Sequence, residues 1–111
     1  MRLSDIKGDR VFDVIADIAA PVYSIATDPA ASELFKKADL KDGEDARDKA
    51  LERLKDALPA LLKGHKDDVC MIIATIEGID PTEYRENVTM AGLFKGIYEM
   101  LTDEDLLSFL S

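Results

Sequence analysis

Any catalytic or metal-binding chemistry in this chain of 111 residues would have to start from one histidine, His65, and one cysteine, Cys70. His65 precedes Asp67 and Asp68 at a predicted helix end, but neighbouring residues on a helix point in different directions, which disfavours a shared metal. We expect His65 to cap a helix or face solvent. Cys70 lies in the apolar run 69–74, so we expect an inert buried thiol. No nucleophile elbow, phosphate-binding loop or calcium-loop pattern occurs, so the sequence predicts no enzyme, no cofactor and no metal.

Two groups of side chains are better suited to binding a partner. Three aspartates recur every four residues and share one face of a helix: Asp9, Asp13 and Asp17. Like charges at this spacing destabilise a helix by about 0.2–0.5 kcal/mol per pair. The row is therefore either a solvated face or a docking ridge for a basic partner. Four apolar side chains gather near the C-terminus: Leu106, Leu107, Phe109 and Leu110.

The C-terminal group lies on a predicted helix of about two turns, which is too short to persist alone in water. It must therefore pack on its own domain, on a second copy or on a partner. If it completes the core, deletion of residues 103–111 should cost several kcal/mol. The sequence favours the other outcome, a docking element whose deletion leaves the fold nearly intact and abolishes partner binding or self-association.

Helical periodicity dominates the segments that would position these groups. In the first long segment, apolar residues recur at three- and four-residue steps: Val11, Val14, Ile15, Ile18, Val22 and Ile25. Pro21 falls inside this pattern and predicts a kink or an end of the helix, because proline removes one backbone donor. Phe12 and Tyr23 lie on the flank of the stripe, so the apolar face is wider than one neighbouring helix would cover.

Later helices are marked by their start and stop signals. Asp28-Pro29 and Asp80-Pro81 each combine a capping aspartate with a first-turn proline. The first of these precedes a short helix with Leu34 and Phe35, and a polar connector follows at 39–43. The last predicted helix begins at 102–105. The predicted helix before it is marked by the apolar residues Leu93, Ile97, Met100 and Leu101.

Between these lie two further predicted helices. One runs from about Glu44 toward Gly64, and Pro59 predicts a kink or break in it. Its expected apolar face consists of Ala50, Leu51, Leu54, Leu58, Leu61 and Leu62. The next is capped by Asp67 or Asp68 and ended by Gly78.

No segment alternates with a two-residue period, so a sheet is not expected. We therefore predict that residues 1–111 form a single all-α domain, a compact bundle of about five to seven short helices.

Charge and composition exclude several classes of protein. There are 14 Lys and Arg against 23 Asp and Glu, which gives a net charge of −9, and residues 67–111 hold 10 of the acids and 2 of the bases. Such a chain should be repelled by nucleic acid and by anionic membranes. The longest apolar run is far shorter than the roughly 20 residues that span a bilayer. A lone cysteine suits a reducing cytoplasm.

Several segments resemble the tail assembly chaperones of long-tailed (siphovirus-type) bacteriophages and of prophages in Gram-positive bacteria. The similar segments, which cover most of the chain in order, are 3–9, 13–21, 59–68, 76–84 and the acidic 102–105. The resemblance implies a non-enzymatic protein of the host cell cytoplasm that is absent from the finished virion. Its partners would be the tape measure protein and the tail tube protein, with a homo-oligomer as a further possibility.

The competing interpretation is an acidic helical adaptor or inhibitor that mimics DNA and binds a basic regulatory protein. Gene position distinguishes the two. A chaperone gene should lie between the tail tube and tape measure genes, whereas an inhibitor gene should lie among regulatory or defence genes.

Overall fold

The structure, a computed structural model, describes residues 2–35 and 46–110 and confirms the all-α prediction. Within these ranges the chain forms seven α-helices and two 3-10 turns and no strand. The elements in chain order are η1 (Leu3–Asp5), α1 (Asp9–Ala26), α2 (Pro29–Ser32), η2 (Glu33–Phe35), α3 (Ala46–Gly64), α4 (Lys66–Glu77), α5 (Pro81–Asn87), α6 (Met90–Thr102) and α7 (Glu104–Leu110). No helix of the described residues is long and apolar enough to cross a membrane.

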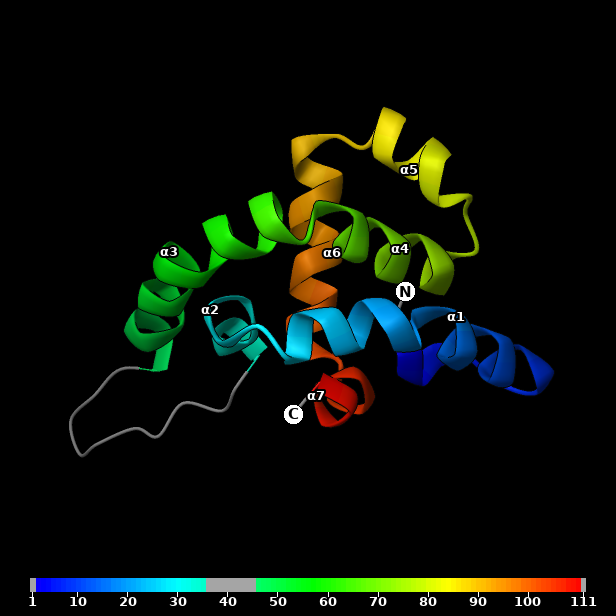
Figure 1. Cartoon of the computed structure of the whole chain (residues 1–111). Coiled ribbons are helices and arrows are strands. Elements are labelled where there is room, and N and C mark those ends of the chain that lie inside the picture. The colour runs from blue at the N-terminus through cyan, green and yellow to red at the C-terminus, as the bar shows by residue number, and fades with distance from the viewer. Residues whose placement is uncertain (1, 36–45, 111) are drawn as a thin grey trace.

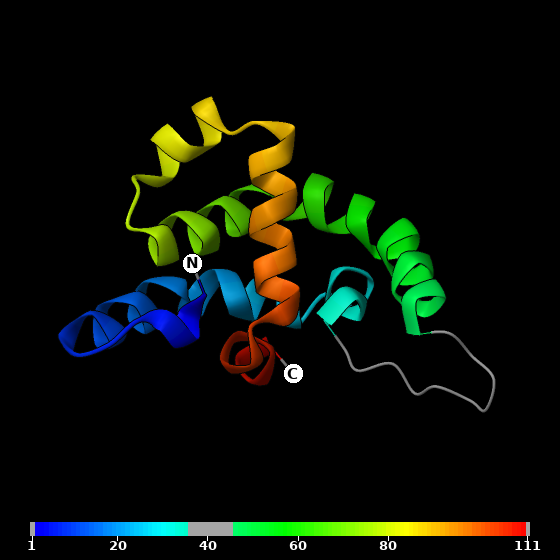
Figure 2. The same ribbon diagram turned by 180° about the vertical axis from the view of Figure 1, so that it is seen from behind.

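The core forms where α1 packs along α4 (Figure 1). α1 contributes Val14, Ile18 and Ile25, each at most 3% exposed, and α4 contributes Val69 and Ile72, which are equally buried. The short α2 and η2 pack on α3, and α5 packs on α4. Seen from behind, α6 crosses in front of α1 and α4 (Figure 2). This crossing is close because residue 96 is glycine.

The absence of a side chain at Gly96 is what allows α6 to approach α4. A Cβ atom built there would lie 2.8 Å from Cδ1 of Ile73, closer than real side chains pack. Gly78 serves a different purpose, since it ends α4 in the left-handed conformation with φ of 77°, as the sequence predicts. There the Arg10 guanidinium donates hydrogen bonds to the carbonyl oxygens of Thr75 and Ile76, at 3.1 and 2.8 Å. One α1 side chain thus satisfies two carbonyl groups at the end of α4.

Of the two alternatives predicted at each proline, a kink or an end of the helix, the end does not occur. α1 runs unbroken past Pro21, and α3 runs past Pro59. Proline has a backbone angle compatible with a helix, but it removes one hydrogen bond and its ring crowds the carbonyl group one turn earlier. In α1 that cost is offset by burial, because Pro21 is itself buried and Ile18, Val22 and Ile25 around it are fully or nearly buried.

The predicted caps are mostly confirmed. Asp28 accepts a hydrogen bond from the Ala30 backbone N–H, and Asp80 accepts from the N–H groups of Thr82 and Glu83. Asp103 begins α7 as expected. The predicted cap of α4 is wrong, because His65 occupies that position and Asp67 and Asp68 lie in the first turn.

Part of the predicted α3 face lies outside what the structure describes. Leu61 is fully buried, and Leu58 and Leu62 are half-buried. The side chains of Ala50, Leu51 and Leu54 lie outside the described residues, as does the connector at 39–43.

Candidate partner-binding surface

The C-terminal helix α7 packs on its own domain, whereas the sequence analysis favoured a docking element for a partner or a second copy. It packs against α1, α6 and η1, and Leu106 is 0% exposed. Leu107 is half-buried against the core, whereas Phe109 keeps 41% of its surface exposed. The side chain of Leu110 lies outside the described residues. The helix is too short to be stable alone, and its own core rather than a partner supplies the missing contacts.

A buried aspartate fixes the start of α7. Asp103 is 1% exposed, and its carboxyl group accepts hydrogen bonds from the backbone N–H groups of Leu3 and Leu106. The hydroxyl of Ser4 lies 3.4 Å from the same group. These contacts join the N-terminal turn η1 to the C-terminal helix, which the sequence did not indicate.

The aspartate row is where the sequence placed it, on the exposed surface of α1. Asp9, Asp13 and Asp17 are all exposed, and none forms an ion pair with another residue of the described ranges. Asp17 borders a hollow between α1, α4 and the start of α5 that Met71 and Ile79 also line. The row therefore offers its charges to solvent or to a partner.

Several large apolar side chains that the sequence did not mark as partner-binding residues are exposed. On α1 these include Phe12 and Tyr23, at 76% and 71%. On α6, Met90, Phe94 and Tyr98 are exposed at four-residue spacing. Single exposed apolar residues are ordinary, but aligned ones mark interaction sites. The width of the predicted apolar stripe on the first helix was the signal that could have identified the α1 residues.

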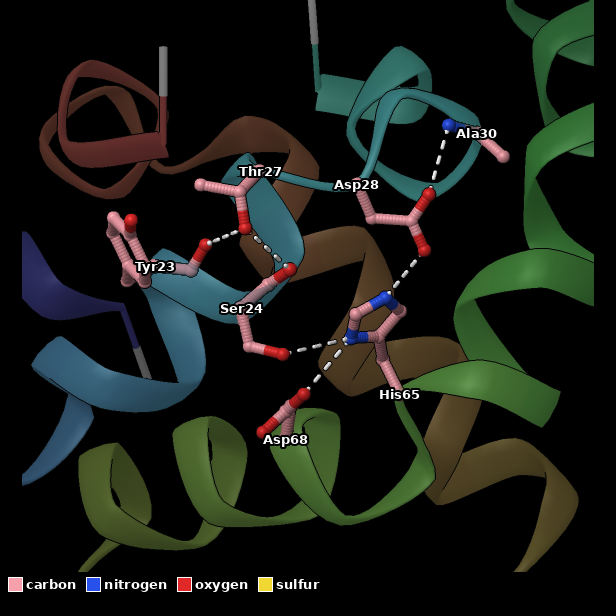
Figure 3. A network of polar contacts seen from close by, with 7 residues as sticks. All are labelled: Tyr23, Ser24, Thr27, Asp28, Ala30, His65 and Asp68. Carbon is pink, nitrogen blue, oxygen red and sulfur yellow. Dashed lines mark hydrogen bonds and ion pairs between the residues drawn. The ribbon is translucent and has the colours of Figure 1, made fainter.

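Of the two alternatives predicted for His65, the capping position is confirmed, because His65 is the N-cap residue of α4, and exposure to solvent is wrong. The ring is 8% exposed and lies between two carboxyl groups that come from different elements (Figure 3). Its Nε2 atom lies 2.7 Å from Oδ2 of Asp28, and its Nδ1 atom lies 2.8 Å from Oδ2 of Asp68. The Ser24 hydroxyl lies 3.3 Å from Nδ1. The ring thus joins α1, the start of α2 and the start of α4.

These contacts shift two pKa values. Burial lowers the pKa of His65, but hydrogen bonds to Asp28 and Asp68 outweigh this effect and hold the pKa above its ordinary value of 6.5. The hydrogen bond from His65 lowers the pKa of the Asp28 carboxyl below 3.8, although burial opposes the change. When the ring is protonated it donates from both nitrogens, and the cluster is then a charged clasp between helices.

The clasp predicts how stability depends on pH. The folded state holds the His65 proton more tightly than the unfolded chain, so its contribution is complete below pH 6.5 and is lost as the pH rises through the raised pKa. The Asp28 contribution is present above pH 3.8 and is lost as the pH falls through the lowered pKa. Urea unfolding from pH 4 to pH 8.5 should therefore show stability falling on the alkaline side. His65→Gln should remove that fall, and an unchanged profile would contradict the assignment.

The contacts of the His65 ring leave neither of its nitrogens without a carboxyl partner. Both ring nitrogens of His65 already face carboxyl oxygens at hydrogen-bond distance. Among the residues that the structure describes, no group of three or more His, Cys, Asp or Glu side chains could hold a metal ion. Cys70 is buried as predicted, and burial raises the pKa of its thiol. A raised pKa leaves less of the reactive thiolate at neutral pH.

No model of a protein family, no curated protein and no solved structure matches the chain.

Proposed function

We propose that the chain is a non-enzymatic tail assembly chaperone that binds the tape measure protein of a long-tailed bacteriophage and helps recruit tail tube subunits. The observation that carries this proposal is the exposure of aligned apolar side chains on α1 and α6 of a domain with a net charge of −9. Apolar helix faces bind amphipathic helices of partners, and a high net charge keeps a complex in solution. Both are properties that a chaperone of a long helical protein needs.

The choice of partner is supported by the resemblance of five segments to tail assembly chaperones. On this proposal the protein acts in the host cell cytoplasm and is absent from the finished virion. An acidic adaptor or inhibitor that binds a basic regulatory protein is the second candidate. The exposed aspartates of α1 favour it, because a row of carboxylates on a helix resembles the charge pattern of a nucleic acid backbone.

Co-expression tests the proposed function. The tape measure protein encoded beside this chain should be largely insoluble when it is expressed alone. We expect it to move to the soluble fraction and to co-purify with the tagged chain when both are expressed. An unrelated acidic helical protein of similar size serves as the control. If the tape measure protein stays insoluble and nothing co-purifies, the proposal is wrong.

A further inference from the structure

α1 carries a second apolar line on the side that α4 does not cover. Its members are Phe12, Ala16, Ala19 and Tyr23, which we call the α1 seam. All four are exposed, and the two aromatic side chains keep 76% and 71% of their surface. The line of Val14, Ile18, Val22 and Ile25 on the other side of α1 is buried. The helix is therefore apolar on two sides, and its own domain covers one of them.

The spacing of the α1 seam fits a single partner helix. Successive members lie four, three and four residues apart, which is the repeat that keeps one stripe facing a neighbouring helix. The seam runs from Phe12 to Tyr23, a rise of about 16 Å and thus the length of three helical turns. Small alanines at its centre permit close approach, and the aromatic rings at its ends offer anchors. No other helix crosses in front of α1 in Figure 1, whereas α6 lies behind it there and in front in Figure 2.

Charges beside the seam specify the chemistry of the partner. Asp9 continues the line three residues before Phe12, and Asp13 follows Phe12 at the edge of the line. Neither forms an ion pair with another residue of the described ranges. α1 has one basic residue, Arg10, and its guanidinium is hydrogen-bonded to the end of α4. The matching surface is therefore apolar with cations along one edge.

We infer that the α1 seam binds a basic amphipathic helix of a partner protein. A second copy of this chain is a poor occupant, because each copy has a net charge of −9 and α1 offers no free cation to the partner's aspartates. This inference rests on the proposed function, which supplies the assumption that the partner is a protein. It adds to that function the surface that binds and the chemistry of the bound segment.

A titration with synthetic helices tests the inference. The probe is a fluorescent peptide of about 18 residues, long enough to form a helix on binding. It has leucine at the positions that would face the α1 seam and lysine on both sides of that leucine stripe. A second peptide has glutamate in place of lysine. We expect the lysine peptide to bind with an affinity that falls as salt is added, and the glutamate peptide to bind at least about tenfold more weakly.

Two pairs of variants locate the binding site. Phe12→Gln with Tyr23→Gln should weaken binding of the lysine peptide at least about tenfold, since aromatic anchors carry most of the energy of an interface. Phe94→Gln with Tyr98→Gln changes the other exposed apolar line, on α6, and should weaken binding of the lysine peptide much less than the change on α1 does. Asp13→Asn should weaken binding more than Asp17→Asn, because Asp17 lies farther round the helix. The inference is wrong if the α1 and α6 double variants lose affinity equally, or if Asp13→Asn and Asp17→Asn do. It is also wrong if the lysine and glutamate peptides bind equally well.

The remaining outcomes separate this inference from the proposed function. If the seam variants still solubilise the tape measure protein, the proposed function stands and the seam is the wrong surface. If the lysine peptide binds the seam but the tape measure protein is not bound, the seam stands and the chaperone proposal fails. Sedimentation equilibrium of the wild type and the seam variant completes the test. Self-association that the seam variant lacks would assign the surface to a second copy and overturn the inference.

Discussion

Leu106→Ala is expected to lower the free energy of unfolding by about 2–5 kcal/mol, the range for removing a buried leucine side chain from a packed core. Leu106 is 0% exposed and belongs to the same core cluster as Ile18 and Ile25. The cavity left by the missing isopropyl group would lie between α7 and α1, two elements in direct contact. Urea unfolding followed by circular dichroism measures the loss.

Phe109→Ala is the matched control, because Phe109 lies on the same short helix with 41% of its surface exposed. It should cost much less than the change at Leu106. Deletion of residues 103–111 should in turn destabilise the fold by several kcal/mol rather than leave it intact. If the truncated chain has the same free energy of unfolding as the wild type, the packing of α7 against α1 does not stabilise the domain, and α7 is a docking element.

Asp103→Ala is the second change with a large expected effect. Asp103 is 1% exposed and accepts hydrogen bonds from the N–H groups of Leu3 and Leu106. Its removal leaves the buried N–H of Leu3 without an acceptor, at a cost of about 1–3 kcal/mol. Loss of the α7 cap adds about 1 kcal/mol.

The comparison variant for this prediction is Asp103→Asn, whose single amide oxygen can accept from one of the two N–H groups that Asp103 holds on separate oxygens. It should be more stable than Asp103→Ala but less stable than the wild type. Hydrogen exchange gives a second readout, since the Leu3 amide should lose protection in the alanine variant. Equal stability of the two variants would show that the contact between η1 and α7 contributes little.

Local signals in the sequence predicted most helix boundaries correctly. Asp28 and Asp80 cap helices that begin with proline, and Gly78 ends α4, because each of these residues acts on backbone groups within a few positions. The errors arose where tertiary packing decides. Pro21 does not end α1, because the surrounding apolar residues are buried on both sides of it.

The same distinction explains what could be predicted of the candidate site. The aspartate row and the flanking Phe12 and Tyr23 follow from helical geometry alone. The clasp of His65 with Asp28 does not, because 37 residues separate the two and only the packing of α4 on α1 brings them together. Leu106 shows the converse problem. Its periodicity is that of any apolar helix face, and the sequence does not state whether the domain or a partner covers it.

The most direct test of the account is whether a stable complex forms. The purified chain would be mixed with a purified helical segment of the tape measure protein and separated by size-exclusion chromatography with light scattering. We expect one peak in which both proteins elute together, with a mass equal to their sum in a whole-number ratio, and we expect this peak to weaken as salt is added. Two separate peaks with the masses of the isolated proteins, at low salt and at micromolar concentration, would contradict the account.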